Sequence, residues 1–186
     1  MPDILKRNFK QDQPGKVLLT DISYLKYAGN QTAYISTILD AGTNEIVCHQ
    51  VSTSLKMDFV LDTLEELRQC EFIRDKAIIH SDQGWHYTNP SFRVRAKRMG
   101  LLQSMSRRGN CWDNAPQESF YGHMKDELAD LIAECTDFAA VVAQIDDWMD
   151  YYTNDRGQWD LMKLTPKEYY NYLQTGIYPL PVYKKE

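Results

Sequence analysis

Three acidic residues have the types and positions best suited to a catalytic role, and they are Asp21, Asp82 and Glu118. Asp21 and Asp82 each follow a short apolar run, which is typical of a strand that delivers a side chain to the edge of a sheet and then turns. Glu118 lies just after Asp113 and Asn114, either of which could cap a helix, and after Pro116, which favours the first turn of a helix. A carboxylate suits that positive helix end. We therefore expect three acids from three elements to converge.

Three converging carboxylates would repel one another unless a cation lay between them. Their hard oxygen atoms select Mg²⁺ or Mn²⁺. Two such ions about 3.5–4 Å apart can activate an attacking oxygen and stabilise the leaving oxygen in an in-line displacement at phosphorus. Each acid alone has a simpler interpretation, Asp21 as a surface residue and Glu118 as a helix-terminal residue. The three together favour a metal site for phosphoryl transfer.

Hydrophobic periodicity predicts the elements that must position these acids. Apolar or alternating runs predict five strands, two of them joined by the turn signal Ala41–Asn44 (AGTN). Apolar residues at helical spacing predict five helices, one of them capped by Asn89. The predicted strands are 17–24, 33–40, 45–51, 77–81 and 101–105, and the predicted helices are 57–70, 90–99, 115–132, 138–152 and 166–173.

The order of these elements predicts an α/β fold with a mixed five-stranded sheet. Three antiparallel strands are followed by two parallel strands, and helices cover both faces. The strand at 77–81 comes after a strand-to-helix crossover, so it should pair in parallel with the strand at 17–24. Asp21 and Asp82 would then be neighbours. The helix that carries Glu118 need only pack across these strands to complete the site.

Length and composition favour one soluble globular domain, with or without a small appendage. Of the 186 residues, 43% are hydrophobic and 25% are charged. No apolar run approaches the roughly 20 residues of a membrane span, and the N-terminus lacks the apolar core of a secretory signal. The four cysteines form no CxxC pair, which favours reduced thiols over disulfides or zinc ligands. We expect a cytoplasmic protein with no membrane partner.

Charge is unevenly distributed along the chain, whose net charge is −5. There is no Asp or Glu from Gln83 to Trp112, whereas Lys125 is the only Lys or Arg from Asp113 to Asp150. A basic patch can bind phosphate whatever the total charge; a solvated helix face is the alternative. The basic residues of the patch are Arg93, Arg95, Lys97, Arg98, Arg107 and Arg108.

Three motifs carry a resemblance to a known family. They are residues 20–24 (TDISY), 80–88 (HSDQGWHYT) and 104–120 (SMSRRGNCWDNAPQESF), and each contains one of the three acids. Thirty-five residues separate Asp82 from Glu118. The chain thus resembles the catalytic core of insertion-sequence transposases of the DDE class, in the retroviral-integrase-like, ribonuclease-H-like superfamily. The likeness extends over residues 5–173.

The resemblance implies a polynucleotidyl transferase in which Asp21, Asp82 and Glu118 bind two Mg²⁺ or Mn²⁺ ions. Such an enzyme nicks DNA at the transposon end with water and then joins the freed 3′-OH to another phosphodiester. Its partners would be transposon-end and target DNA. It would assemble on DNA as a homo-oligomer in the bacterial cytoplasm, associated with the nucleoid.

Residues near the acids have expected supporting roles. Arg107, Arg108 and Asn110 would lie on the active-site loop and contact DNA, as would Arg93, Arg95, Lys97 and Arg98; polar residues without a ligand are the alternative. Asn114 and Ser119 would orient Glu118 or merely cap its helix. His80 would support Asp82 or be an ordinary structural histidine. The aromatic residues that could stack on bases, unless they are buried, are Trp85, Tyr87 and Trp112.

We expect three parts in the chain: an N-terminal linker or tail at 1–16, an integrase-type catalytic core at 17–152, and an extension packed on the core at 153–186. Members of the family usually carry an N-terminal helix-turn-helix region, and no segment here matches one. We therefore expect either an excised core of a longer transposase or a degenerate fragment. A catalytically inactive remnant that only binds DNA or oligomerises is the alternative function, and a plain ribonuclease-H-like nuclease is a third.

Overall fold

The structure of the chain is a computed structural model that describes residues 3–106 and 114–181. Strands and helices follow one another as the periodicity predicted. The strands are β1 (Val17–Tyr27), β2 (Gln31–Asp40), β3 (Ile46–Ser52), β4 (Ile78–Ser81) and β5 (Leu102–Met105). The α-helices are α1 (Met57–Glu66), α2 (Trp85–Thr88), α3 (Pro90–Arg98), α4 (Ala115–Glu134), α5 (Phe138–Asn154) and α6 (Pro166–Thr175).

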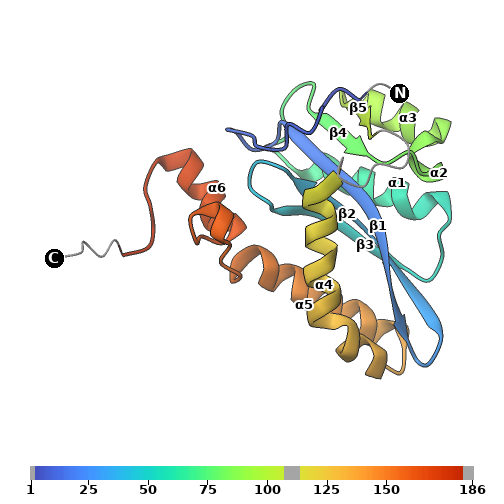
Figure 1. The fold of residues 1–186 in the computed structure, drawn as a ribbon. Coiled ribbons are helices and arrows are strands. Elements are labelled where there is room, and N and C mark those ends of the chain that lie inside the picture. The colour runs from blue at the N-terminus through green and yellow to red at the C-terminus, as the bar shows by residue number, and fades with distance from the viewer. Residues whose placement is uncertain (1–2, 107–113, 182–186) are drawn as a thin grey trace.

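The five strands form one mixed sheet in the order β3-β2-β1-β4-β5. β2 pairs antiparallel with both β1 and β3. β4 pairs in parallel with both β1 and β5. The arrangement confirms the predicted sheet of three antiparallel strands followed by two parallel strands (Figure 1).

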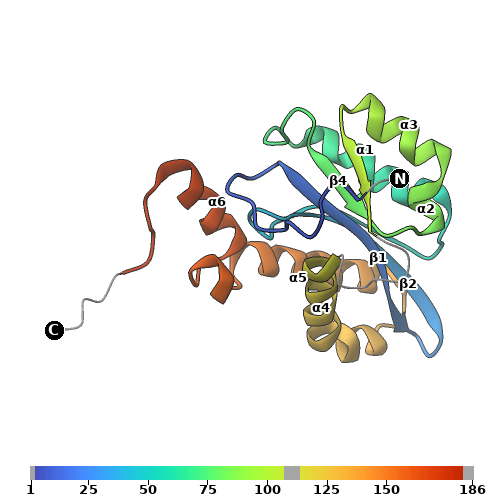
Figure 2. The same cartoon turned by 45° about the horizontal axis from the view of Figure 1, so that its top comes forward.

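Helices cover both faces of the sheet, as predicted. On one face, α4 and α5 bury a cluster that includes Leu19 and Ile35. On the other face, α1 and α3 pack over a second cluster that includes Leu18 and Ile79. Leu18 and Leu19 belong to different clusters because successive side chains of a strand point to opposite faces. Figure 2 shows the sheet between its two helical layers.

β1 is longer than predicted, and its length sets the position of Asp21. It pairs with β4 only over Val17–Leu19, but it pairs with β2 as far as Tyr27. Leu25 and Tyr27 are both buried beneath α4 and α5, so burial on one face continues past the predicted end of the strand at Tyr24. β1 and β2 therefore extend as a two-stranded ribbon beyond β4 (Figure 1).

Several helix boundaries differ from the prediction at their ends. The helix predicted over 57–70 is α-helical only to Glu66 and continues as the 3₁₀ helix η1 (Leu67–Gln69), a tightening that is common at helix C-termini. The short helix α2 was not predicted, because four residues carry too little periodicity to reveal it. The segment 154–164, which lies between the last two predicted helices, contains the 3₁₀ helix η3 (Trp159–Leu161).

Polar side chains begin three of the helices. Asn89 accepts a hydrogen bond from the Ser91 N–H at 2.9 Å, as predicted for the cap of α3. Asn114 lies at the N-cap of α4, but the capping predicted for it is wrong, since its side chain makes no such hydrogen bond. Its backbone, at φ −138° and ψ 34°, lies outside the extended region that aims a cap at the helix. The other candidate cap, Asp113, lies outside the described residues. The remaining side-chain caps are Asp137 on α5 and Thr165 on α6.

Residues 3–16 contain no helix or strand, but they lie against the core. Leu5 is buried in the cluster beneath α4, and its N–H donates to the Ser104 Oγ of β5 at 3.2 Å. The Gly15 N–H donates to Asp40 Oδ1 at the end of β2 at 2.9 Å. The segment predicted as a linker thus contacts two strands, and the predicted domain boundaries at 16 and 152 stay predictions.

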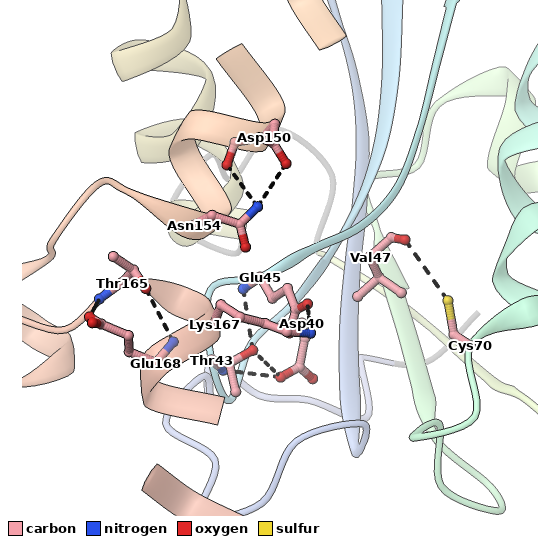
Figure 3. Close-up of polar contacts among 10 residues, drawn as sticks. All are labelled: Asp40, Thr43, Glu45, Val47, Cys70, Asp150, Asn154, Thr165, Lys167 and Glu168. Carbon is pink, nitrogen blue, oxygen red and sulfur yellow. Dashed lines mark hydrogen bonds and ion pairs between the residues drawn. The ribbon is translucent and has the colours of Figure 1, made fainter. Parts of the chain in front are cut away.

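Side-chain contacts tie α6 to the turn between β2 and β3 (Figure 3). Asp40 Oδ2 accepts hydrogen bonds from the N–H and the hydroxyl of Thr43 at 3.0 and 2.9 Å. Lys167 of α6 lies 3.4 Å from the Glu45 carboxylate at the same turn. The chain after α5 therefore contacts the core here. None of the helices in the described ranges is long and apolar enough to cross a membrane.

Candidate active site

Asp21 and Asp82 lie at matching positions on two neighbouring parallel strands. Leu19 of β1 is paired with His80 of β4. Asp21 and Asp82 each come two residues after this pair; Asp21 is still in β1, whereas Asp82 directly follows β4. Because the strands run in the same direction, both acids emerge at the same end of the pair. This arrangement agrees with the prediction that Asp21 and Asp82 are neighbours.

A tight turn fixes Asp82 at the end of β4. Its Oδ1 accepts a hydrogen bond from the Gly84 N–H at 2.8 Å. A Cβ atom at position 84 would lie 2.8 Å from the same oxygen, so a larger residue there would displace either the carboxylate or the turn. Asp82 is exposed to solvent, which leaves the carboxylate open to a ligand.

α4 is anchored to the sheet by two buried side chains that flank Glu118. The Tyr121 hydroxyl donates to the carbonyl oxygen of Asp21 at 2.8 Å and lies 2.9 Å from the Thr37 hydroxyl. The Gln117 amide donates to the same Thr37 hydroxyl. Gln117 and Tyr121 are one helical turn apart and share the face of α4 that meets the sheet. They hold the exposed Glu118 on the helix turn nearest Asp21.

Burial raises the pKa of Asp21 to about 7, and the negative charges of Asp82 and Glu118 add to the increase. Two groups act in the opposite direction. The Ile22 N–H donates to Asp21 Oδ1 at 2.8 Å, and the charge of Lys125 also lowers the pKa of Asp21. Asp21 therefore interacts electrostatically with both of the other acids, as convergence requires.

The three acids share this environment without forming a closed metal cluster. Within residues 3–106 and 114–181, no three His, Cys, Asp or Glu side chains lie close enough to hold a metal ion together. Asp82 and Glu118 are exposed, so rotation of their side chains can bring oxygen atoms toward an ion. Three carboxylates from three elements match the ligands that Mg²⁺ and Mn²⁺ prefer. The donor set therefore fits a divalent ion, and the metal site stays a prediction.

Lys125 is a candidate that the sequence reasoning did not single out for the site. It lies on α4 seven residues after Glu118, so the two side chains share one face of the helix. Its Nζ lies 5.2 Å from the centre of the Tyr24 ring of β1. Its spacing from Glu118 and its isolation among acids were the available signals. The charge of Lys125 lowers the pKa of Asp21, so a positive charge lies in the neighbourhood of the acids.

Three residues predicted to support the acids have mixed surroundings. His80 is buried, and its Nδ1 lies 2.9 Å from Ser104 Oγ. Asn114 is buried, and neither polar atom of its side chain has a hydrogen-bond partner among the described residues. Ser119 is exposed on the first turns of α4. These contacts do not decide between a supporting and a structural role, so the roles stay predictions.

The residues predicted to touch DNA lie in two places. Arg93, Arg95, Lys97 and Arg98 are all on α3, whereas Arg107, Arg108 and Asn110 lie outside the described residues, as does Trp112. Trp85, which follows Asp82 by three residues, is 60% exposed. Tyr87 is buried and packs edge-on against Phe92 with ring centres 5.3 Å apart. Tyr87 therefore takes the buried alternative and not the stacking role.

The mixed sheet with α4 laid across β1 is the fold of ribonuclease-H-like integrase cores. The sequence matches the integrase core domain family over residues 11–111, and a second description of that domain over residues 99–166. The chain belongs to the integrase core domain family.

The relatives of the chain include proteins of bacterial insertion sequences. It is 32% identical over 170 residues to InsK of insertion sequence element IS150 in Escherichia coli K12, a match that covers 91% of this chain and 59% of that protein. It is 32% identical over 167 residues to an uncharacterized transposase-like protein of Haemophilus influenzae, with 90% and 76% covered. The chain thus spans about three fifths of the length of the Escherichia coli relative.

Solved structures of viral integrases share the fold. The magnesium-bound catalytic core domain of HTLV-2 integrase superposes with a TM-score of 0.66 at 12% identity, covering 83% of this chain and 95% of that one. The catalytic core domain of BIV integrase gives a TM-score of 0.63 at 18% identity, with 87% and 97% covered. Both agree with the predicted ribonuclease-H-like architecture.

Proposed function

We propose that this chain is the catalytic core of a transposase that cuts a DNA strand and joins the freed 3′-OH to another phosphodiester. The observation that carries the proposal is geometric: Asp21 and Asp82 come at the same end of the parallel pair β1 and β4, and Tyr121 docks α4, which carries Glu118, on the Asp21 backbone. Membership of the integrase core domain family and the insertion-sequence relatives support it.

The proposed chemistry assigns a role to each acid. Asp21, Asp82 and Glu118 would hold two Mg²⁺ or Mn²⁺ ions, which when bound activate the attacking oxygen and stabilise the leaving oxygen. Asp21 must lose its proton to act as a ligand. Gly84 keeps the Asp82 carboxylate at the end of β4, and Gln117 and Tyr121 keep Glu118 over β1. Lys125 would neutralise a phosphate that approaches the three carboxylates.

DNA and further copies of the chain are the proposed partners. The basic residues of α3 and the exposed Trp85 would contact the strand outside the acids. Assembly on DNA would bring two ends together, as transposition needs.

A plasmid nicking assay tests the proposal without knowledge of any terminal repeat. Wild-type protein should convert supercoiled plasmid to open circles in Mn²⁺, and Asp82→Asn should retain its fold but lose the activity by at least about a hundredfold. Circular dichroism and the melting temperature would report the fold. Equal nicking by wild type and Asp82→Asn would overturn the role of Asp82.

A catalytically inactive remnant is the second candidate. Its supporting observation is that no preformed metal cluster exists among the residues that the structure describes. In that case neither protein would nick the plasmid, although wild type would still shift a labelled duplex in a gel.

A further inference from the structure

A cavity of about 770 Å³ lies beside the ends of α1 and α3, away from the three acids. Apolar side chains, including Ile73 and Leu101, form part of its lining. Among the described residues, its lining includes four arginines. The arginines are Arg68 and Arg74, near the end of α1 and before β4, and Arg95 and Arg98, on the last turns of α3.

We call this cavity, lined by Arg68, Arg74, Arg95 and Arg98, the arginine pocket. The acidic residues in its lining do not neutralise all of its arginines. Two acids line it, Glu65 and Asp75. Glu65 lies 2.8 Å from Arg68 and 3.7 Å from Arg95, so one carboxylate is shared by two guanidinium groups. Within the described ranges, no carboxylate lies within 4 Å of the Arg98 guanidinium. Four positive charges against two negative charges leave the pocket cationic in a chain whose net charge is −5.

The arginine pocket is separate from the candidate active site. Its lining residues Ile73, Arg74 and Asp75 precede β4 in the chain, whereas Asp82 follows β4. β4 has 4 residues, which at roughly 3.3 Å per residue span about 13 Å. Leu101 likewise comes just before β5. The pocket therefore opens at the amino ends of the parallel strands and the acids lie at the carboxyl ends.

Guanidinium groups are matched to phosphate by shape as well as by charge. Each presents a planar fork of N–H donors that can bind two phosphate oxygens at once. A cavity of this size suits a nucleotide-sized ligand, and ligand sites combine apolar side chains with a small number of polar groups.

We propose that the arginine pocket binds phosphate groups, with Arg95 and Arg98 as the main contacts and with the apolar part of the lining against the attached sugar or base. The phosphate has two possible sources, the backbone of a DNA strand that runs along α3 and a free nucleotide. The DNA source rests on the proposed function, whereas the nucleotide source does not.

Two double variants, each of which removes two positive charges, test the proposal. Arg95→Gln with Arg98→Gln removes two charges from the pocket lining, and the control, Lys10→Gln with Lys26→Gln, removes two exposed charges elsewhere on the surface. Binding of a labelled DNA duplex is measured by fluorescence anisotropy over a range of salt concentrations, without divalent metal. The pocket variant should bind about tenfold more weakly, with a log–log salt slope smaller by about two, and the control should lose about threefold or less.

Calorimetry with pyrophosphate, and separately with a nucleoside diphosphate, tests the second source. Wild type and the control variant should bind at least one of these probes, and the pocket variant should not. Dependence of only the small probes on Arg95 and Arg98 assigns the pocket to a free phosphate ligand. Equal weakening of duplex by both variants, together with no binding of either probe, overturns the proposal.

Two further measurements distinguish a failure of this proposal from a failure of the proposed catalytic function or of folding. If the proposed catalytic function fails, Glu118→Gln and wild type will behave alike in plasmid nicking, but the difference between the two double variants will remain. If the pocket variant does not fold, Arg74→Gln with Arg98→Gln replaces it. A change in oligomeric state on gel filtration, with unchanged binding of duplex and probes, would assign the pocket to a protein contact and contradict the proposal.

Discussion

Asp21 combines burial with two acidic neighbours, and both raise its pKa. A carboxyl group whose pKa is raised on folding stabilises the folded state only while it is protonated. That stabilisation is complete below the ordinary pKa of 3.8 and is lost as pH rises through the folded value of about 7. At pH values above 7 the ionised Asp21 therefore destabilises the metal-free protein.

Asp21→Asn should stabilise the metal-free protein at about pH 8 by the order of 1–3 kcal/mol, because it removes this buried charge. Urea unfolding in the presence of a chelator would measure the gain. At about pH 4 wild type and variant should be equally stable, since Asp21 is then protonated. A variant that is less stable than wild type at the higher pH would contradict the electrostatic account of Asp21.

The same proton competes with a metal ion for Asp21. Metal ligands must be deprotonated, so Mn²⁺ affinity should rise by about tenfold per pH unit below pH 7 and level off above it. Calorimetric titrations from about pH 5.5 to about pH 8 would show the trend. Asp82→Asn should lower the affinity at every pH. An affinity that does not change with pH below 7 would remove Asp21 from the metal site.

Glu118 can reach Asp21 only if α4 packs on β1 at one particular position along the strand. Tyr121 links the two elements directly, because its hydroxyl donates to the backbone carbonyl of Asp21 itself. Tyr121→Phe keeps the buried ring but leaves buried acceptors unpaired, which should destabilise the fold by about 1–3 kcal/mol. The affinity for Mn²⁺ should fall as well, because Glu118 is no longer held at a fixed position relative to Asp21.

The control for this variant is Tyr24→Phe. Tyr24 is 54% exposed, so loss of its hydroxyl should leave stability unchanged within about 0.5 kcal/mol. Urea unfolding and Mn²⁺ calorimetry are measured on both proteins. Unchanged Mn²⁺ affinity in Tyr121→Phe would show that the link to Asp21 does not position Glu118.

Elements with strong periodicity could be predicted from the sequence, and elements defined by tertiary contacts could not. The five strands and the long helices carry repeating apolar positions, so their existence and order followed. α2 is only 4 residues long and has no period to detect. The far end of β1 depends on its pairing with β2. The contact of Leu5 with the core depends on Ser104, which is distant in the chain.

The residues of the candidate site could likewise be predicted from the sequence only in part. Asp21, Asp82 and Glu118 were found because each follows an apolar run or a capping segment. Gln117 and Tyr121 look like ordinary helix residues until the helix is docked on the sheet. The pocket of arginines joins residues from α1, α3 and the segment before β4, so the chain order could indicate a basic patch but not a cavity.

The molecule as a whole depends on two apolar clusters separated by the sheet. Leu64 is fully buried in the cluster beneath α1 and α3, whereas Leu131 on α4 is 52% exposed. Leu64→Ala should destabilise the protein by about 2–5 kcal/mol, because it leaves a cavity in a packed core. Leu131→Ala should change stability by less than about 1 kcal/mol. Similar losses in both variants, measured by urea unfolding, would contradict the two-layer description of the core.

The central claim is that Asp21, Asp82 and Glu118 form one divalent metal site, and Mn²⁺ calorimetry tests it most directly. The titration compares wild type with Glu118→Gln, each with and without a short DNA duplex. We predict that wild type binds Mn²⁺, more tightly with the duplex, and that Glu118→Gln weakens this binding at least about tenfold while retaining the fold. Equal Mn²⁺ affinity in wild type and Glu118→Gln, or no binding by either protein even with duplex present, would contradict the account.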